Sequence, residues 1–114
     1  MFTVSKNRVV KDWPVVIPVP QDGGRVMKYD AKVDFEIISQ PEHDALSVRG
    51  GTDADLLNRV VVGWPGGQFQ HEDETPLLFN EESKTQLFAI SYVRQALVAA
   101  YLLAFTGREG QRKN

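Results

Sequence analysis

An unbroken alternation of apolar and charged residues over positions 27–37 constrains the fold more than any other part of the sequence. Its apolar members are Met27, Tyr29, Ala31, Val33, Phe35 and Ile37. Between them fall Lys28, Asp30, Lys32, Asp34 and Glu36. Successive side chains of a β-strand point to opposite faces, so this pattern predicts a strand with one face on a core and the other in water.

A second strand is predicted just before it, at the edge of a sheet. Its apolar residues share one parity, and the other parity carries Pro14, Pro18 and Pro20. Proline has no N–H to donate, so one side of this strand cannot pair normally. Residues 21–24, Gln-Asp-Gly-Gly, form a turn sequence. We therefore expect a β-hairpin over about residues 12–38, and we leave open whether residues 2–10 add a further strand.

Helix signals begin after the hairpin. Ser39 and Glu42 form a capping-box pattern before a short helix over about residues 40–47. This helix is expected to stop near Gly50 and Gly51. Thr52 is then expected to cap a second helix, whose apolar side is formed by Leu56, Leu57, Val60 and Val61.

The C-terminal half predicts a loop and further helices. A loop is expected over residues 63–80, and Asn80 is a suitable cap for a third helix. A final helix is predicted from about Ser91 to Thr106, with Gly107 at its C′ position. Whether these last helices are separate near residues 90–91 stays open.

Together these elements predict one α+β domain over residues 1–114, in which an N-terminal antiparallel β-hairpin or sheet precedes a C-terminal set of three to four helices. The length of 114 residues suits one domain, and folding would bury roughly two thirds of the unfolded surface. We expect a β-rich part over about residues 1–38, a helical part over about 39–107 and a flexible basic tail over 108–114. The chain has no cysteine, which excludes disulfides and thiolate metal sites.

Charge and hydropathy argue against two classes of partner. The net charge of −2 disfavours broad attraction to nucleic acid. The longest uncharged apolar run, residues 96–105, is about half of what a membrane-spanning helix needs. The N-terminus also lacks the pattern of a signal peptide. We therefore expect an intracellular protein that binds neither nucleic acid nor membranes.

Catalytic and metal-binding patterns are weak. His43 and His71 are isolated, and a surface position is expected for both. Residues 72–74 are acidic but lack the spaced oxygen ligands and the glycine of a cation-binding loop. The glycines at 63, 66 and 67 lack the lysine and hydroxyl of a phosphate loop. We therefore predict no catalytic, cofactor-binding or metal-binding residues, and no enzyme.

The final helix carries more apolar residues than the single stripe expected of a helix on the surface of a small domain. One face collects Ile90, Val93, Leu97, Tyr101 and Ala104, and a neighbouring face collects Val98, Leu102 and Phe105. A central helix held between the hairpin and the shorter helices explains this pattern. A docking surface on the second face is the alternative, and both can hold together. Trp64 is likewise either a core residue or an interface anchor. The candidate protein-binding residues are Trp64, Tyr92, Val98, Tyr101, Leu102 and Phe105.

Three segments resemble the tail assembly chaperones and related small tail proteins of long-tailed phages and prophages. They are residues 53–64 (Asp-Ala-Asp-Leu-Leu-Asn-Arg-Val-Val-Val-Gly-Trp), 76–82 and 90–97, within a resemblance that covers about residues 12–105. Family members often have proline at the position of Ser91 and a longer Asp-Gly loop near residues 71–75.

The resemblance implies a non-enzymatic chaperone of the bacterial host cytoplasm that binds the long helical tape measure protein, keeps it soluble and recruits the tail tube protein. A helix-in-groove contact would cover the apolar stripes of such a partner. The alternative reading is a structural minor tail or head–tail connector subunit that stays in the virion. Homo-oligomerisation is compatible with either.

Overall fold

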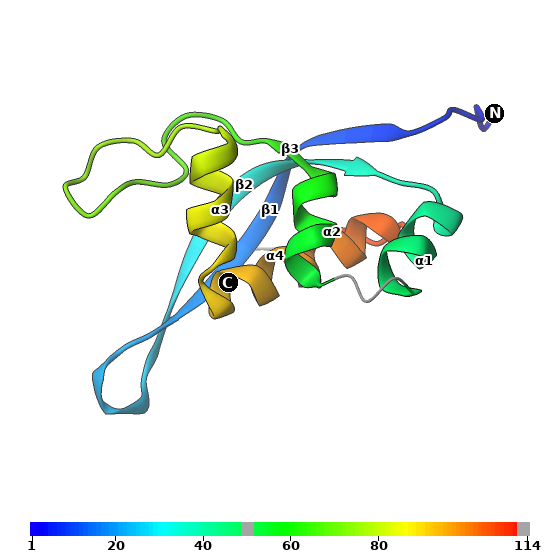
Figure 1. The fold of residues 1–114 in the computed structure, drawn as a ribbon. Helices are drawn as coiled ribbons and strands as arrows, with labels where there is room; N and C mark the ends of the chain where they lie inside the picture. Colours follow the sequence, from blue (N-terminus) through cyan, green and yellow to red (C-terminus); the bar gives the residue numbers. More distant parts are fainter. Residues whose placement is uncertain (49–51, 112–114) are drawn as a thin grey trace.

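The computed structural model describes residues 1–48 and 52–111, and it confirms the α+β class. Figure 1 shows a long hairpin, a short third strand and four helices. The strands are β1 (Arg8–Pro20), β2 (Val26–Ile37) and β3 (Val61–Gly63), in the sheet order β1-β2-β3, with a short 3-10 turn, η1 (Asp22–Gly24), in the hairpin. The helices are α1 (Gln40–Val48), α2 (Asp53–Val60), α3 (Glu81–Phe88) and α4 (Ser91–Phe105). The expected helix stop at Gly50 and Gly51 and the last basic residues, Arg112 and Lys113, lie outside the described residues.

The hairpin is confirmed, and its first strand is longer than expected. Residues 8–10 join β1 through a bulge, because Val10 pairs with Phe35 whereas Trp13 pairs with Val33. Asp12 adopts a positive φ of 54° in this bulge, and its N–H donates to Asp34 Oδ1 at 2.9 Å. Because the bulge adds one residue, the even-numbered side chains before it face the core, whereas the odd-numbered ones do so after it. Val10 therefore packs against the core.

The outer edge of β1 is blocked, as its prolines predict. On this outer edge, the N–H of Val16 is the one backbone donor between Pro14 and Pro18, and it donates to Gln111 Oε1 at 3.3 Å. The backbone N–H groups of even-numbered residues here therefore point away from β2, and those of odd-numbered residues form the hydrogen-bond ladder with β2. Gly110 lies against the same edge, where an added Cβ would stand 2.6 Å from Pro14 Cγ. The segment before the C-terminus thus covers the side of β1 that has few donors.

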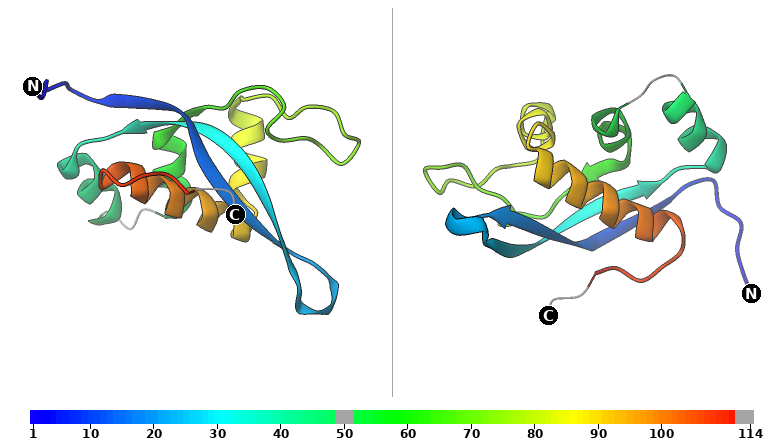
Figure 2. Two further views of the ribbon diagram at one scale, coloured as in Figure 1. Left: turned by 180° about the vertical axis from the view of Figure 1, so that it is seen from behind. Right: turned by 90° about the horizontal axis from the view of Figure 1, so that it is seen from below.

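Helix α4 is the centre of the core. Figure 2 shows it between the hairpin and the shorter helices, which is the arrangement that the sequence predicted. Leu97 and Tyr101 are fully buried, and Trp13 Nε1 donates to the carbonyl of Ala100 at 3.0 Å. Odd positions of the strands supply the facing wall, namely Val15, Ile17, Ala31, Val33 and Phe35.

Helices α3 and α4 are separate, which resolves the question that the sequence left open. They bend by 103° at Ala89 and Ile90. Arg94 Nε donates to the carbonyl of Phe88 at 2.7 Å and closes the bend. No single helix in the described ranges is long and apolar enough to cross a membrane. Taken together, the two helices of this bent pair reach the required length and apolar composition. Gly107 ends α4 with a φ of 74°, as expected.

The predicted caps are present with one exception. Thr52 and Asp55 form a complete capping box on α2, and Asn80 Oδ1 accepts from the N–H of Ser83 on α3. On α1, Ser39 Oγ accepts from the N–H of Glu42 at 3.2 Å. The carboxylate of Glu42 does not complete a box, because it pairs with Arg59 instead. A charged partner outcompetes a neutral backbone donor.

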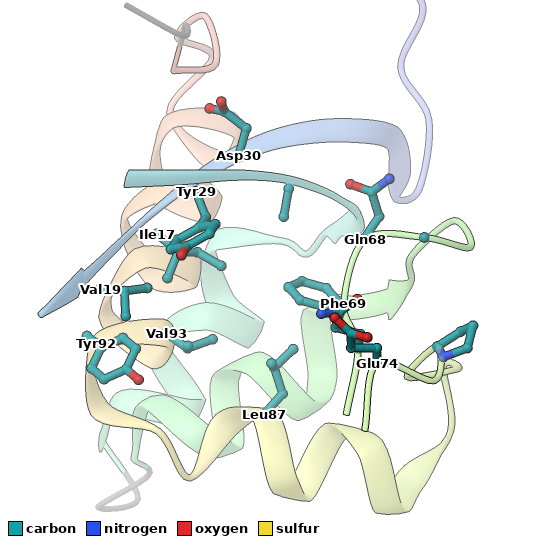
Figure 3. Close-up of a pocket in the computed structure, with 14 residues that line it drawn as sticks. Ile17, Val19, Tyr29, Asp30, Gln68, Phe69, Glu74, Leu87, Tyr92 and Val93 are labelled. Atoms are coloured by element: carbon teal, nitrogen blue, oxygen red, sulfur yellow. The ribbon is translucent and has the colours of Figure 1, made fainter. Parts of the chain in front are cut away.

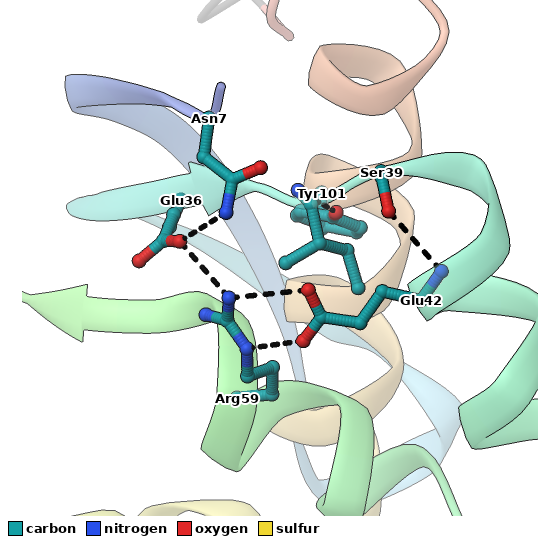
Figure 4. Close-up of polar contacts among 7 residues, drawn as sticks. Asn7, Glu36, Ser39, Glu42, Arg59 and Tyr101 are labelled. Carbon is teal, nitrogen blue, oxygen red and sulfur yellow. Dashed lines mark hydrogen bonds and ion pairs between the residues drawn. The ribbon is translucent and has the colours of Figure 1, made fainter.

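Arg59 of α2 joins two other elements through its guanidinium group (Figure 4). Nη2 donates to Glu36 Oε2 of β2 at 3.0 Å, and both Nη2 and Nε donate to the carboxylate of Glu42 on α1. Asn7 Nδ2 donates to Glu36 Oε2 at 2.8 Å. The hydrogen bonds from Arg59 and then from Asn7 hold the pKa of Glu36 below its usual value. This cluster fixes α1 and α2 on the sheet.

Because only the outer edge of β1 is blocked, proline substitutions along this strand should lower the free energy of unfolding by unequal amounts. Val16→Pro removes one outward N–H and should lower the free energy of unfolding by about 1 kcal/mol. Ile17→Pro removes a ladder donor and should cost about 3 kcal/mol or more beyond the burial loss, which Ile17→Ala measures. Urea unfolding of the three variants tests this. If the two proline variants lose the same free energy of unfolding, once the burial loss measured by Ile17→Ala is subtracted, the assigned hydrogen-bond ladder is wrong.

The pKa of Glu36 predicts a pH dependence. Because its folded-state pKa is lowered, the ionised group stabilises the fold above its unfolded pKa, and this stabilisation is lost as pH falls through the folded pKa. The free energy of unfolding should therefore fall from about pH 5 to about pH 3, and Glu36→Gln should flatten that slope. Denaturant titrations at each pH measure it. Glu82→Gln is the control, since it removes an exposed carboxylate outside the cluster. A slope unchanged by Glu36→Gln would refute the assignment.

Candidate binding groove

A groove of about 410 Å³ opens between the hairpin, the loop after β3 and the α3–α4 bend. Figure 3 shows Ile17, Val19 and Tyr29 of the strands, Phe69 and Glu74 of the loop, and Leu87, Tyr92 and Val93 of the helices around it. Its volume lies in the range of about 300–1,000 Å³ that is typical of ligand pockets. The walls are mainly apolar, so the groove suits an apolar side chain or a short peptide segment.

The strand wall of the groove exists because the hairpin extends beyond α4. Ile17 is 6% exposed where the helix covers it, whereas Tyr29 is 51% exposed and Met27 50%. These residues share the parity of the core positions. The apolar face of the sheet therefore continues past the helix, and its uncovered end becomes the wall.

The loop wall is ordered by Trp64. Its Nε1 donates to the carbonyl of Leu77 at 2.9 Å, and its ring meets Phe69 and Phe79 edge-on at 5.1 and 4.9 Å between centroids. The N–H of Leu77 donates to the carbonyl of Phe69 at 2.9 Å, and Gln70 and Pro76 form a bridge. The expected loop over residues 63–80 is thus a folded excursion that begins with β3. Val61, expected on α2, starts this strand, where β-branched side chains are favoured.

The mouth of the groove carries the acidic side chain of Glu74, and Glu72 and Asp73 line the adjoining hollow beside α3. The side chain of Asp30 lies on the other face of β2 and points away from the groove (Figure 3). Neither lining, as far as the chain is described, includes lysine or arginine. The hydroxyl and N–H of Thr75 donate to Asp73 Oδ1 at 2.6 and 3.1 Å, and these bonds lower the pKa of Asp73. The acidic side chains at and beside the mouth favour a basic ligand.

One edge of β2 borders this groove without a neighbouring strand. The β3 ladder reaches only Asp34 and Phe35. The next outward N–H, at Lys32, donates to the side chain of Gln68, whose Oε1 lies 2.8 Å away. Toward the turn, at Lys28 and Asp30, β2 has no adjacent strand within residues 1–48 and 52–111. A backbone edge beside an apolar groove is the geometry used for strand addition.

The predicted binding residues do not form one surface. Trp64 is 8% exposed and Tyr101 is fully buried, so both belong to the core. The hydroxyl of Tyr101 accepts from the N–H of Ile38 at 3.4 Å, and burial raises the pKa of Tyr101. Tyr92 lines the groove and is the one predicted residue that does so.

The second face of α4 is partly covered by α1. Val98 and Phe105 are half-buried, and Leu102 is exposed. The ring of Phe105 stacks on His43 at 4.6 Å. His43, expected at the surface, is half-buried as a result, whereas His71 is exposed as expected. None of these α4 residues lines the groove, and no group of acidic and histidine side chains in the described ranges could hold a metal.

Sequence reasoning missed Tyr29, Phe69 and Leu87 as groove residues. The sequence did give a sign for Tyr29, because it lies on the apolar face of β2 and the predicted final helix is too short to cover that whole face. The other two gave none, because the loop excursion that brings Phe69 opposite Leu87 depends on Trp64. Comparison with protein-family models, curated proteins and solved structures finds no match for this chain.

The role of Trp64 can be tested by Trp64→Phe. This change leaves the carbonyl of Leu77 without its donor and should lower the free energy of unfolding by about 1–3 kcal/mol. Amide hydrogen exchange should accelerate over residues 67–77. Tyr92→Phe is the matched control, because the Tyr92 hydroxyl makes no hydrogen bond among the described residues, and it should stay within about 0.5 kcal/mol of wild type. Unchanged stability in Trp64→Phe would show that the loop is held by other contacts.

Proposed function

We propose that the protein is a non-enzymatic tail assembly chaperone that works in the host cytoplasm. In this role it binds an apolar segment of the tape measure protein and assists assembly of the tail tube protein. The observation that carries the proposal is the apolar groove with its acidic mouth, which fits a peptide segment better than a reaction centre.

The segments that carry the family resemblance contribute to this groove, and two of them line it through Pro76, Tyr92 and Val93. Residues 53–64 form α2, β3 and Trp64, which holds the loop. Residues 76–82 return that loop to α3, and residues 90–97 form the start of α4 with Tyr92. Their short motifs thus support one recess, and the hairpin and residues 67–70 supply most of its lining. This is consistent with a binding task for the segments.

The chemistry of the groove specifies the segment that it would accept. Apolar walls favour one or two large apolar side chains, and the acidic mouth favours lysine or arginine beside them. An exposed apolar stripe on a long coiled protein promotes aggregation until it is covered. A chaperone that binds such stripes one at a time would keep the tape measure protein soluble.

A structural role is the second candidate, and the exposed N-terminal segment favours it. Met1, Phe2 and Val4 are among the most exposed apolar side chains of the described residues. Such segments commonly bind neighbouring subunits, which would place the protein in a ring at the head–tail junction or among minor tail proteins. Detection of the chain in purified particles would support this role, and its absence would support the chaperone.

Co-expression with the tape measure protein tests the chaperone function. The wild-type chain should keep that partner soluble and co-purify with it. Tyr29→Glu combined with Tyr92→Glu places charges in the groove and should reduce recovery about tenfold or more. Val62→Glu, on the exposed face of β3 and outside the groove, is the matched control and should bind normally. An insoluble partner with wild type, or equal recovery with all variants, would contradict the proposal.

A further inference from the structure

Three aromatic side chains surround the groove, and they come from three separate elements. Tyr29 belongs to β2, Phe69 to the loop after β3 and Tyr92 to the first turn of α4. Figure 3 shows Tyr29 and Tyr92 on one side of the groove and Phe69 on the other. Tyr29 is 51% exposed, and Phe69 and Tyr92 are half-buried, so part of each ring can contact a ligand. We call these three residues the aromatic frame.

The ring of Phe69 is held in position in the free protein. The ring of Trp64 meets it edge-on at 5.1 Å between centroids, and Trp64 is itself anchored by its hydrogen bond to the carbonyl of Leu77. The N–H of Leu77 in turn donates to the carbonyl of Phe69 at 2.9 Å. A side chain that is already ordered loses little entropy when a ligand binds, so this wall of the groove is suited to recognition.

Glu74 places a carboxylate beside the aromatic frame. Its side chain lines the groove on the same side as Phe69 (Figure 3). Glu74 is exposed and forms no ion pair with any residue in the ranges 1–48 and 52–111. The part of the lining that the structure describes includes no lysine, arginine or histidine. Among these residues, nothing neutralises the carboxylate, and a cationic ligand can do so.

The backbone of Glu74 adopts a conformation that glutamate disfavours. Its φ is 69°, in the left-handed region that glycine adopts without strain. The residue lies in a tight turn, in which its N–H donates to the carbonyl of His71 at 2.9 Å and the N–H of His71 donates to the carbonyl of Thr75 at 2.8 Å. Glycine would form the same turn more easily. The fold therefore does not require glutamate here, and its effect on binding can be separated from its effect on stability.

We propose that the groove binds the side chain of an arginine, which the aromatic frame and Glu74 select. Ile17, Leu87 and Val93 give the lining an aliphatic part, which contacts the methylene stem of the arginine. The guanidinium group stacks on a ring of the aromatic frame and donates to the carboxylate of Glu74. One long side chain with an apolar stem and a planar cationic head thus satisfies all three parts of the lining.

Other side chains satisfy this lining less well. An aliphatic side chain fills the apolar part but leaves the carboxylate of Glu74 without a partner. Lysine carries a compact, strongly hydrated ammonium group, which neither stacks on a ring nor donates in the paired geometry of a guanidinium. Arginine is thereby assigned to the segment of the tape measure protein that the proposed function places in the groove, and in this respect the assignment rests on that function.

Titration of the full-length chain with three short peptides tests the preference. In each peptide two leucines flank a central arginine, lysine or citrulline, and citrulline has the shape of arginine without its charge. The aromatic NMR signals of Tyr29, Phe69 and Tyr92 report binding. The arginine peptide should bind about fivefold more tightly than the lysine peptide and about tenfold more tightly than the citrulline peptide. Equal binding of the arginine and citrulline peptides, or no binding of the arginine peptide at millimolar concentration, would overturn the proposal.

A substitution at position 74 separates binding from folding. Glu74→Gly relieves the positive φ, so the midpoint of urea unfolding should not fall, yet binding of the arginine peptide should weaken about tenfold. Glu82→Gln removes an exposed carboxylate outside the groove and should bind like wild type. Tyr92→Leu keeps an apolar side chain but removes one ring, and it should weaken the arginine peptide about threefold or more. Unchanged affinity in Glu74→Gly would show that the carboxylate does not select the ligand.

The tape measure protein distinguishes this assignment from the chaperone function. If wild type and Glu74→Gly keep that partner soluble and co-purify with it equally well, the chaperone function stands and the arginine assignment fails. If the arginine peptide binds as expected but the tape measure protein does not co-purify with wild type, the groove accepts arginine and the chaperone function fails.

Discussion

A mismatch in length between the hairpin and the helix that covers it determines the rest of the structure. β1 has 13 residues and would extend about 43 Å, whereas the 15 residues of α4 extend about 22 Å. One helix therefore covers about half of the apolar face that the alternation creates. The covered half is the core around Leu97 and Tyr101, and the uncovered half must be closed by another part of the chain or stay open to a ligand.

The chain closes that uncovered half only in part. The loop after β3 crosses beside it, held at Trp64, and places Phe69 opposite Leu87 across a recess. A complete third strand would have filled this space and paired the edge of β2. Instead β3 ends after three residues, and the side chain of Gln68 takes the place of one backbone partner at Lys32. The groove and the open edge are thus two consequences of one short strand.

The local elements could be read from the sequence, whereas the groove could not. Alternation, prolines and caps act within a few residues, so the hairpin, α2, α3 and α4 followed from them. The bulge at Asp12 and the strand β3 depend on partners far along the chain, such as Asp34. Glu42 illustrates the same limit, since its local capping pattern loses to Arg59, which comes 17 residues later. Tyr101 and Trp64 were recognised as important, but an apolar side chain gives no sign of whether it faces the core or a partner.

The two edges of the sheet are treated in opposite ways, and this asymmetry bears on function. The β1 edge combines prolines, the Gln111 side chain and the close approach of Gly110, which together occupy this edge at Pro14 and Val16. Natural sheets block their edges in this way when pairing would lead to aggregation. Among the described residues the β2 edge has neither a proline nor a neighbouring strand at Lys28, and it lies beside an apolar recess. Strand addition is therefore favoured at this edge over the β1 edge, because apolar pockets beside it can select the segment that binds.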